Sequence, residues 1–106
     1  MNSTAVFITH RAAPGRRDEV HAVWQRHMEP AIDANPDHVA YVYSFADDDP
    51  DVIRAFQLYT SAEAAAAFLR SAAYAAYVED VTPLLAGPPE VHTGTPMWTK
   101  GIATRR

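Results

Sequence analysis

The sequence predicts an α+β fold, built as one domain of residues 1–106 with the element order β-α-β-β-α-α-β. Four segments are rich in β-branched and aromatic residues and alternate with period two, as strands do. Two other segments repeat apolar residues at spacings of three and four, as amphipathic helices do, and a capped alanine run between them predicts a third helix. Proline, glycine and aspartate punctuate the boundaries between them.

The first half of the chain predicts a helix with one strand before it and one strand after it. Residues 4–11 alternate as a strand, and residues 16–29 carry apolar side chains at helical spacing. The first turn of this helix holds two acidic residues, the sign of charge that the helix dipole favours there. Pro30 is expected to close or kink the helix, and residues 38–45 return to period two as the second strand.

The middle of the chain is its most informative part. Residues 47–51, which are four aspartates and a proline, predict the loop of a hairpin that leads into a strand over residues 52–59. In the step Thr60-Ser61-Ala62-Glu63, a hydroxyl can accept from a backbone N–H of the first helical turn while Glu63 reaches back to the cap. A helix follows to about residue 70, and Ser71 can cap a second helix that Pro83 disrupts near its end.

The last strand is expected over residues 91–98, and Gly94 and Pro96 place it at a sheet edge or a bulge. Residues 101–106 are expected to be frayed. The whole order corresponds to the ferredoxin-like plan, a four-stranded antiparallel sheet with its helices on one face. The opposite face would carry too many apolar residues for open water, so we expect a homodimer in which two sheets close against each other.

Composition excludes several classes of function. A net charge of −4 with scattered basic residues argues against a nucleic-acid partner. The sequence has no cysteine, which excludes disulfides, thiolate metal sites and cysteine nucleophiles. No apolar run approaches the length of a membrane span, and the first residues lack a signal-peptide pattern, so we expect a cytoplasmic protein without a membrane partner. No phosphate-cradling glycine loop or dinucleotide fingerprint is present.

These features resemble the antibiotic biosynthesis monooxygenase (ABM) domain family over nearly the whole chain. The resemblance implies a dimeric α+β barrel with a pocket between helices and sheet in each subunit. It also implies oxidation of quinols or polycyclic phenols without metal or flavin, so we expect no cofactor and no metal site. The resemblance rests on the element order and on Pro14-Gly15, Tyr59-Thr60-Ser61-Ala62-Glu63, Ser71-Ala72-Ala73-Tyr74 and Pro96-Met97-Trp98-Thr99-Lys100.

One branch of this family degrades haem, and the sequence departs from that branch. The branch uses an asparagine on the first strand, a tryptophan at the end of the third and an iron-binding histidine on the last helix. Ile8, Tyr59 and either Tyr77 or Val78 stand at these positions here. The departure argues against haem degradation, although tyrosine can ligate haem iron, so Tyr77 keeps haem binding as a third alternative.

Histidines are the first candidates for chemistry because they titrate near neutral pH. None of the five histidines has a partner at metal-ligand spacing. His27 lies on the apolar stripe of the first helix, where it is either a histidine at the edge of the core or a base in a pocket. His10, at the end of the first strand, is a candidate for contact with the substrate.

Aromatic residues predict a pocket for a planar phenolic ligand. If Tyr59 faces the helices, its hydroxyl points toward the last helix, where Tyr77 also points. We assign catalytic roles to His27, Tyr59 and Tyr77, with the alternative that the aromatic cluster is core only. The residues expected to contact a small aromatic substrate are His10, Trp24, Phe68, Tyr74 and Trp98.

The function expected from the sequence is therefore that of a small cofactor-independent monooxygenase acting on a quinol or polycyclic phenol. A pocket base would take a phenolic proton, and the electron-rich substrate would then react with dioxygen. The alternative is a non-catalytic binding or scaffold dimer, because four consecutive alanines before Phe68 can either leave a cavity or allow close helix packing.

Overall fold

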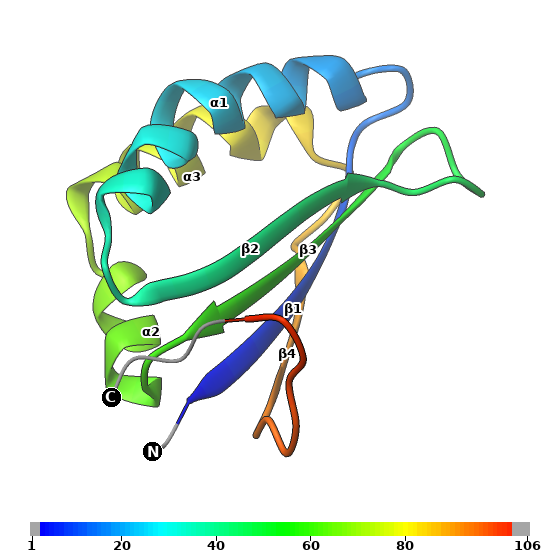
Figure 1. Ribbon diagram of the computed structural model, residues 1–106. Coiled ribbons are helices and arrows are strands. Elements are labelled where there is room, and N and C mark those ends of the chain that lie inside the picture. The colour runs from blue at the N-terminus through cyan, green and yellow to red at the C-terminus, as the bar shows by residue number, and fades with distance from the viewer. Residues whose placement is uncertain (1–2, 103–106) are drawn as a thin grey trace.

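The computed structural model describes residues 3–102 and confirms the α+β prediction: one four-stranded antiparallel sheet carries its helices on one face (Figure 1). Of the segment expected to be frayed, residues 103–106 lie outside the described range. The elements in chain order are β1 (Thr4–Arg11), α1 (Arg17–Ala34), β2 (His38–Phe45), β3 (Val52–Tyr59), α2 (Ala62–Phe68), α3 (Ala72–Val81), the 3-10 turn η1 (Thr82–Leu84) and β4 (Glu90–Gly94).

The strand order in the sheet is β2-β3-β1-β4, so β3 and β1 are central and β2 and β4 are edges. The register pairs Ile8 with Ala55 and His10 with Ile53 across the two central strands. On the other side of β3, Tyr43 pairs with Ala55. Opposite residues of neighbouring strands point to the same side of a sheet, so these residues share one face. Ile8, Tyr43 and Ile53 belong to the core that also contains helix residues, so this is the face that the helices cover.

Serine hydroxyls cap the starts of α2 and α3. Ser61 accepts a hydrogen bond from the backbone N–H of Ala64 at 3.0 Å, and Ser71 accepts one from that of Tyr74 at 3.2 Å. The cap of α2 is therefore Ser61, which leaves Glu63 one residue short of the position from which it could reach back. The hydroxyl of Thr60 instead donates to Oδ1 of Asp37 at 2.7 Å.

Helix α1 differs from the prediction because it continues through Pro30 to Ala34. A proline in a helix removes one hydrogen bond and crowds the preceding turn. The side chains around Pro30 offset this cost: Met28 is buried before it, and Ala31 and Ile32 pack against the core after it. Burial of this apolar face thus favours helix on both sides of the proline.

Strand β4 is shorter than predicted, since pairing with β1 ends at Gly94. Its position at the sheet edge confirms the expectation drawn from Gly94 and Pro96. Proline lacks the N–H that would continue the ladder, so regular pairing stops before it. Beyond the strand, Met97 and Trp98 are 90% and 79% exposed.

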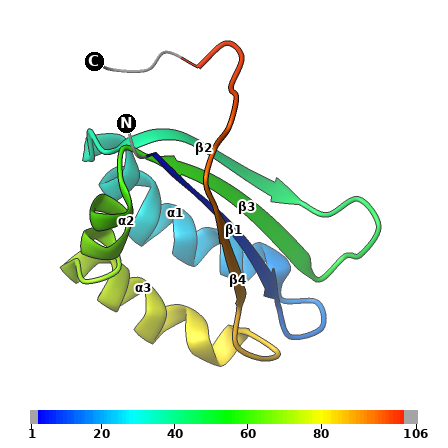
Figure 2. The same ribbon diagram turned by 90° about the horizontal axis from the view of Figure 1, so that it is seen from below.

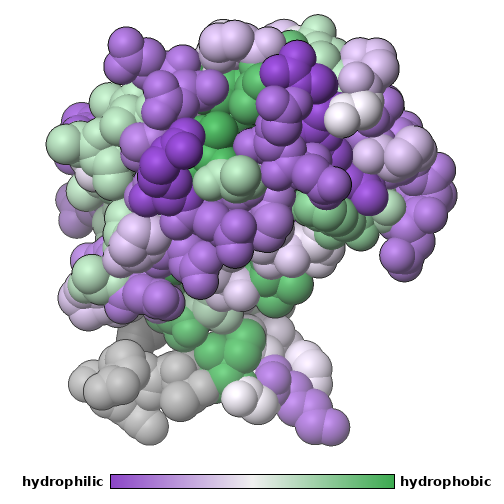
Figure 3. Space-filling model, turned by 90° about the horizontal axis from the view of Figure 1, so that it is seen from above, coloured by the Kyte–Doolittle hydropathy of each residue, from purple (hydrophilic) through white to green (hydrophobic). Residues whose placement is uncertain are grey.

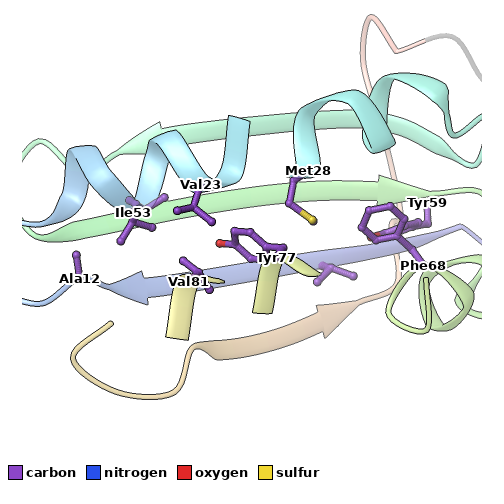
Figure 4. Close-up of a cluster of buried hydrophobic side chains, with 10 residues drawn as sticks. Ala12, Val23, Met28, Ile53, Tyr59, Phe68, Tyr77 and Val81 are labelled. Carbon is purple, nitrogen blue, oxygen red and sulfur yellow. The ribbon is translucent and has the colours of Figure 1, made fainter. Parts of the chain in front are cut away.

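The core fills the space between the sheet and helices α1 and α3 (Figure 4). Tyr77 lies in the middle of this layer, near Val23 and Val81, whereas Tyr59 and Phe68 lie together at the end beside α2 (Figure 4). Most of the outward helical surface is hydrophilic, with a narrow hydrophobic band (Figure 3).

The second face of the sheet carries no helix among residues 3–102 (Figure 2). Register places Val42, Phe56 and Phe7 in one row across β2, β3 and β1 on this face. Phe7 is 48% exposed and Val42 is 55% exposed, and the rings of Phe7 and Phe56 lie 5.4 Å apart. This apolar row is the bare surface that the sequence predicts.

One guanidinium connects α1 to the hairpin between β2 and β3. Nη1 of Arg17 lies 3.3 Å from the carbonyl oxygen of Ala46, 2.9 Å from that of Asp49 and 3.2 Å from that of Val52. The same guanidinium stacks over the ring of Phe45 at 4.1 Å from its centroid. The acidic hairpin is therefore held to the start of the helix.

No helix within residues 3–102 combines the length and apolarity that a membrane crossing requires.

Candidate functional site

A small cavity lies between the sheet and the helices, with a volume of about 30 Å³, enough for one or two water molecules. Its walls come from all four strands and from the two longer helices, so it occupies the centre of the layer. Most of the lining is aromatic, and imidazole and phenol groups supply its polar atoms. The lining residues are Ile8, His10, Trp24, Tyr41, Tyr43, Ala55, Tyr74, Tyr77, Pro89 and Val91.

His10 and Tyr77 form the polar pair of the cavity. The hydroxyl of Tyr77 lies 3.4 Å from Nε2 of His10, and the two rings meet edge to face at 70°. His10 is only 9% exposed and its Nδ1 has no hydrogen-bond partner. Buried polar atoms are usually paired, so a nitrogen with neither a partner nor contact with solvent is unusual.

Burial controls the protonation of both groups. It lowers the pKa of His10 from its ordinary value, because desolvation penalises the charged imidazolium. Burial also raises the pKa of Tyr77, and the neighbouring Tyr41 and Tyr74 add to this effect. At neutral pH the pair therefore consists of a neutral imidazole that can accept a proton and a phenol that can donate a hydrogen bond.

Tyr41 and Tyr43 add further hydroxyl groups to the lining. Burial raises the pKa of Tyr41 to about 12 and raises that of Tyr43, which also lies near Tyr77. The hydroxyl of Tyr43 is buried without a partner, whereas that of Tyr41 accepts a hydrogen bond from Nε1 of Trp24 at 3.3 Å. Both hydroxyls therefore stay protonated and neutral near pH 7.

The structure brings four of the residues predicted for the site together around the cavity: His10, Trp24, Tyr74 and Tyr77. Trp98 lies beyond β4 and does not line it. Exposed at 79%, its side chain faces solvent in the single chain.

His27 does not line the cavity either. Its Nε2 lies 2.7 Å from Oδ2 of Asp80, so it bridges α1 to α3 with a side chain that is 21% exposed. His27 therefore lies at the edge of the core, which was the alternative to a base in the pocket. Its partner there is the carboxylate of Asp80.

Tyr59 faces the helices, as expected, but at the far end of the layer. It is 1% exposed, and its hydroxyl donates to Oε1 of Gln57. The ring of His38 lies 4.4 Å from that of Tyr59 and 4.7 Å from that of Phe68. Tyr59 and Phe68 thus form a separate aromatic cluster with His38, outside the lining of the cavity.

The sequence reasoning missed Tyr41 and Tyr43. The alternation of β2 puts both on one face, and their register opposite Gln57 and Ala55 turns that face toward the helices. The signal was present in the alternation, but strand pairing was needed to show which side it faced. For metal ligands, the described residues contain no group of three histidine, cysteine or acidic side chains placed to hold an ion.

Comparisons with known proteins agree with the fold. The family model described as antibiotic biosynthesis monooxygenase matches residues 4–80. A candidate antibiotic biosynthesis monooxygenase from Chloroflexus aurantiacus J-10-fl is 26% identical, with a TM-score of 0.81 over 95% of this chain and 99% of that chain. No match is found among curated protein sequences.

Two more solved structures share the fold at lower identity. A candidate monooxygenase of the same description from Caulobacter crescentus CB15 is 18% identical, with a TM-score of 0.85 over 92% of each chain. A variant of SnoaB, a cofactor-independent oxygenase from Streptomyces nogalater, is 15% identical, with a TM-score of 0.80 over 95% of this chain and 99% of that one. Because the family model matches most of this chain, the chain belongs to the antibiotic biosynthesis monooxygenase family.

Proposed function

We propose that this protein is a cofactor-independent monooxygenase that oxidises a quinol or a polycyclic phenol at the aromatic cavity. The observation that carries the proposal is the buried pair of His10 and Tyr77 in a cavity lined mainly by aromatic rings. Family membership supports the reaction class, and the fold shared with SnoaB, an oxygenase without a cofactor, is consistent with it. Flat apolar walls with a few hydroxyl groups suit a planar phenolic ligand.

In the proposed mechanism, neutral His10 accepts the acidic proton of the substrate. Sequence reasoning gave this role to His27, but its position against Asp80 makes His10 the stronger candidate. Tyr77 and Tyr43 would donate hydrogen bonds to the oxyanion that forms. The carbanion form of the substrate then gives electrons to dioxygen, one oxygen atom remains as the new carbonyl, and the other leaves as water.

The protein would contribute desolvation and orientation, while the substrate supplies the electrons. A charged phenolate buried in an apolar site needs partners, and the free Nδ1 of His10 and the unpaired hydroxyl of Tyr43 are polar atoms that the empty cavity leaves unsatisfied. A phenol can form hydrogen bonds with these two atoms and a hydrocarbon cannot, so the site should bind the phenol more tightly.

We further propose a homodimer formed through the bare face of the sheet. Phe7 and Val42 flank Phe56 in one apolar row on this face, and each of the two is about half exposed. An exposed apolar patch of this kind typically marks a protein interface. The ion pair between Arg54 and Asp48, at 3.6 Å, lies on the same side and leaves that guanidinium 56% exposed.

Oxygen consumption over a panel of quinols and anthrones tests the oxidation. We expect His10→Gln and Tyr77→Phe to reduce kcat by about 10²-fold or more, because general-base and oxyanion contributions have this size. His27→Gln is the matched control and keeps most of the activity. Equal consumption by wild type and His10→Gln would show that the assignment of the base is wrong.

A non-catalytic binding or scaffold dimer is the second candidate, and the small volume of the cavity favours a pocket that side chains largely fill. If no substrate of the panel consumes oxygen while planar phenols bind saturably, this second function replaces the first. Calorimetric titration of the same panel without oxygen distinguishes the two.

A further inference from the structure

Two hollows share a single aromatic wall formed by Trp24, Tyr41 and Tyr43. The inner hollow is the cavity of about 30 Å³ that holds His10 and Tyr77. The outer hollow is an open groove of about 400 Å³ between α1 and β2. The three wall residues line both, and the rest of the groove is formed by His21, Gln25, Glu29, Ile32 and Asp33.

Neither hollow alone suits a polycyclic phenol. Pockets that enclose drug-sized ligands measure about 300–1,000 Å³, roughly ten times the inner cavity or more. The groove is large enough, but neither His10 nor Tyr77, the pair to which the oxidation is assigned, lines it. A ring system that reaches His10 must therefore displace part of the wall.

Trp24 is the part of the wall that can move. Its indole stacks on Tyr43 with centroids 4.1 Å apart, and its Nε1 donates to the hydroxyl of Tyr41 at 3.3 Å, near the long limit for a hydrogen bond. The side chain is partly exposed at the groove. By contrast, Tyr43 sits on a strand in register with the centre of the sheet.

Polar atoms on both sides of the wall lack partners while it is closed. They are Nδ1 of His10 and the hydroxyl of Tyr43 at the cavity, and Nδ1 of His21 at the groove. A buried polar atom without a partner raises the free energy of the state that contains it. A ligand that pairs these atoms thus binds the open arrangement better than the closed one, which is the condition for shifting the equilibrium.

Building on the proposed function, we propose that the cavity and the groove are two halves of one site for a planar phenol of several fused rings, and that Trp24, held by Tyr41, separates them in the free protein. The phenolic end would reach His10, and the remaining rings would lie in the groove. Trp24 then determines the specificity for large ring systems, because only these need both halves.

Calorimetry with 2-hydroxyanthraquinone and phenol tests the proposal, since neither probe depends on turnover. Tyr41→Phe removes only the hydroxyl that holds Trp24. Loss of one hydrogen bond changes an equilibrium constant by about 2- to 12-fold. We expect the three-ring probe to bind more tightly by this factor, because a larger fraction of the protein is open. Binding of phenol, which fits the groove alone, should change less than twofold.

A second measurement follows Trp24 itself. The chain has two tryptophans, so Trp98→Phe leaves Trp24 as the only one. In that background, Tyr41→Phe should increase acrylamide quenching of Trp24. The control Tyr74→Phe removes a hydroxyl from the same cavity but not the one bonded to Trp24, and it should leave quenching unchanged.

The proposal is overturned if Tyr41→Phe shifts both probes equally, if it weakens the three-ring probe, or if neither probe binds. Unchanged quenching of Trp24 would also contradict it. If the expected binding results are obtained but no substrate consumes oxygen, only the proposed oxidation is wrong. The two-part site would stand, because the probes report binding without reaction.

Discussion

Lowering the pH should destabilise this protein through His10. The loss should begin at a higher pH than any loss caused by protonation of the protein's carboxylates. Burial lowers the pKa of His10 below 6.5, so the unfolded chain takes up a proton at a pH where the folded chain does not. The free energy of unfolding is therefore full above pH 6.5 and falls as the pH drops toward the folded pKa. Glu19 and Asp49 have lowered pKa values too, but from starting values of 4.5 and 3.8.

The size of the effect has an upper limit. One group that is protonated only in the unfolded state contributes a slope of at most about 1.4 kcal/mol per pH unit. Between pH 6.5 and pH 5.0, His10 thus accounts for a loss of at most about 2 kcal/mol. His38, whose pKa is lowered mainly by burial, adds a second loss of the same sign.

Urea unfolding of wild type and His10→Gln at pH 7.0, 6.0 and 5.0 measures this contribution. Protein concentration must be fixed, because association would add to apparent stability. Glutamine does not titrate, so the variant should lose less stability than wild type between pH 7.0 and 5.0. Parallel curves for the two proteins would refute the reasoning that His10 is buried in its neutral form.

Three further predictions follow from other elements. Ser61→Ala should lower the free energy of unfolding by about 0.5–2 kcal/mol, measured by urea, because α2 loses its cap; an unchanged midpoint would contradict this. Phe7→Asp should convert the proposed dimer to single chains in sedimentation while circular dichroism stays native, because a charge enters the apolar row. Pro30→Ala should raise the melting temperature, because α1 already passes through this position and regains a backbone hydrogen bond.

Local sequence patterns predicted three of the four strands well. The bounds of β1, β2 and β3 coincide with residues 4–11, 38–45 and 52–59, because alternation and turn residues mark both ends of each strand. The end of α1 was wrong because Pro30 is a local signal for helix termination, whereas packing of residues on both sides of it decides the outcome.

The site depended on information that one strand or helix does not contain. His27 lies on an apolar stripe of α1, but that stripe is wide enough to face both the sheet and α3, and periodicity does not say which side a given residue meets. Tyr59 was placed on the correct face. However, it is four residues along β3 from Ala55 at the cavity, about 13 Å away at strand spacing.

Arg17 has a consequence for how the acidic hairpin can be handled. A loop tip rich in small polar residues is the usual place to insert an epitope or to find a protease cut. Here one guanidinium holds three carbonyl oxygens, two within the turn at Ala46 and Asp49 and one at Val52, where β3 begins. A lengthened tip would pull these oxygens apart, and lysine would lack the planar group that stacks over the ring of Phe45. The hairpin should therefore resist proteases and tolerate grafted peptides poorly.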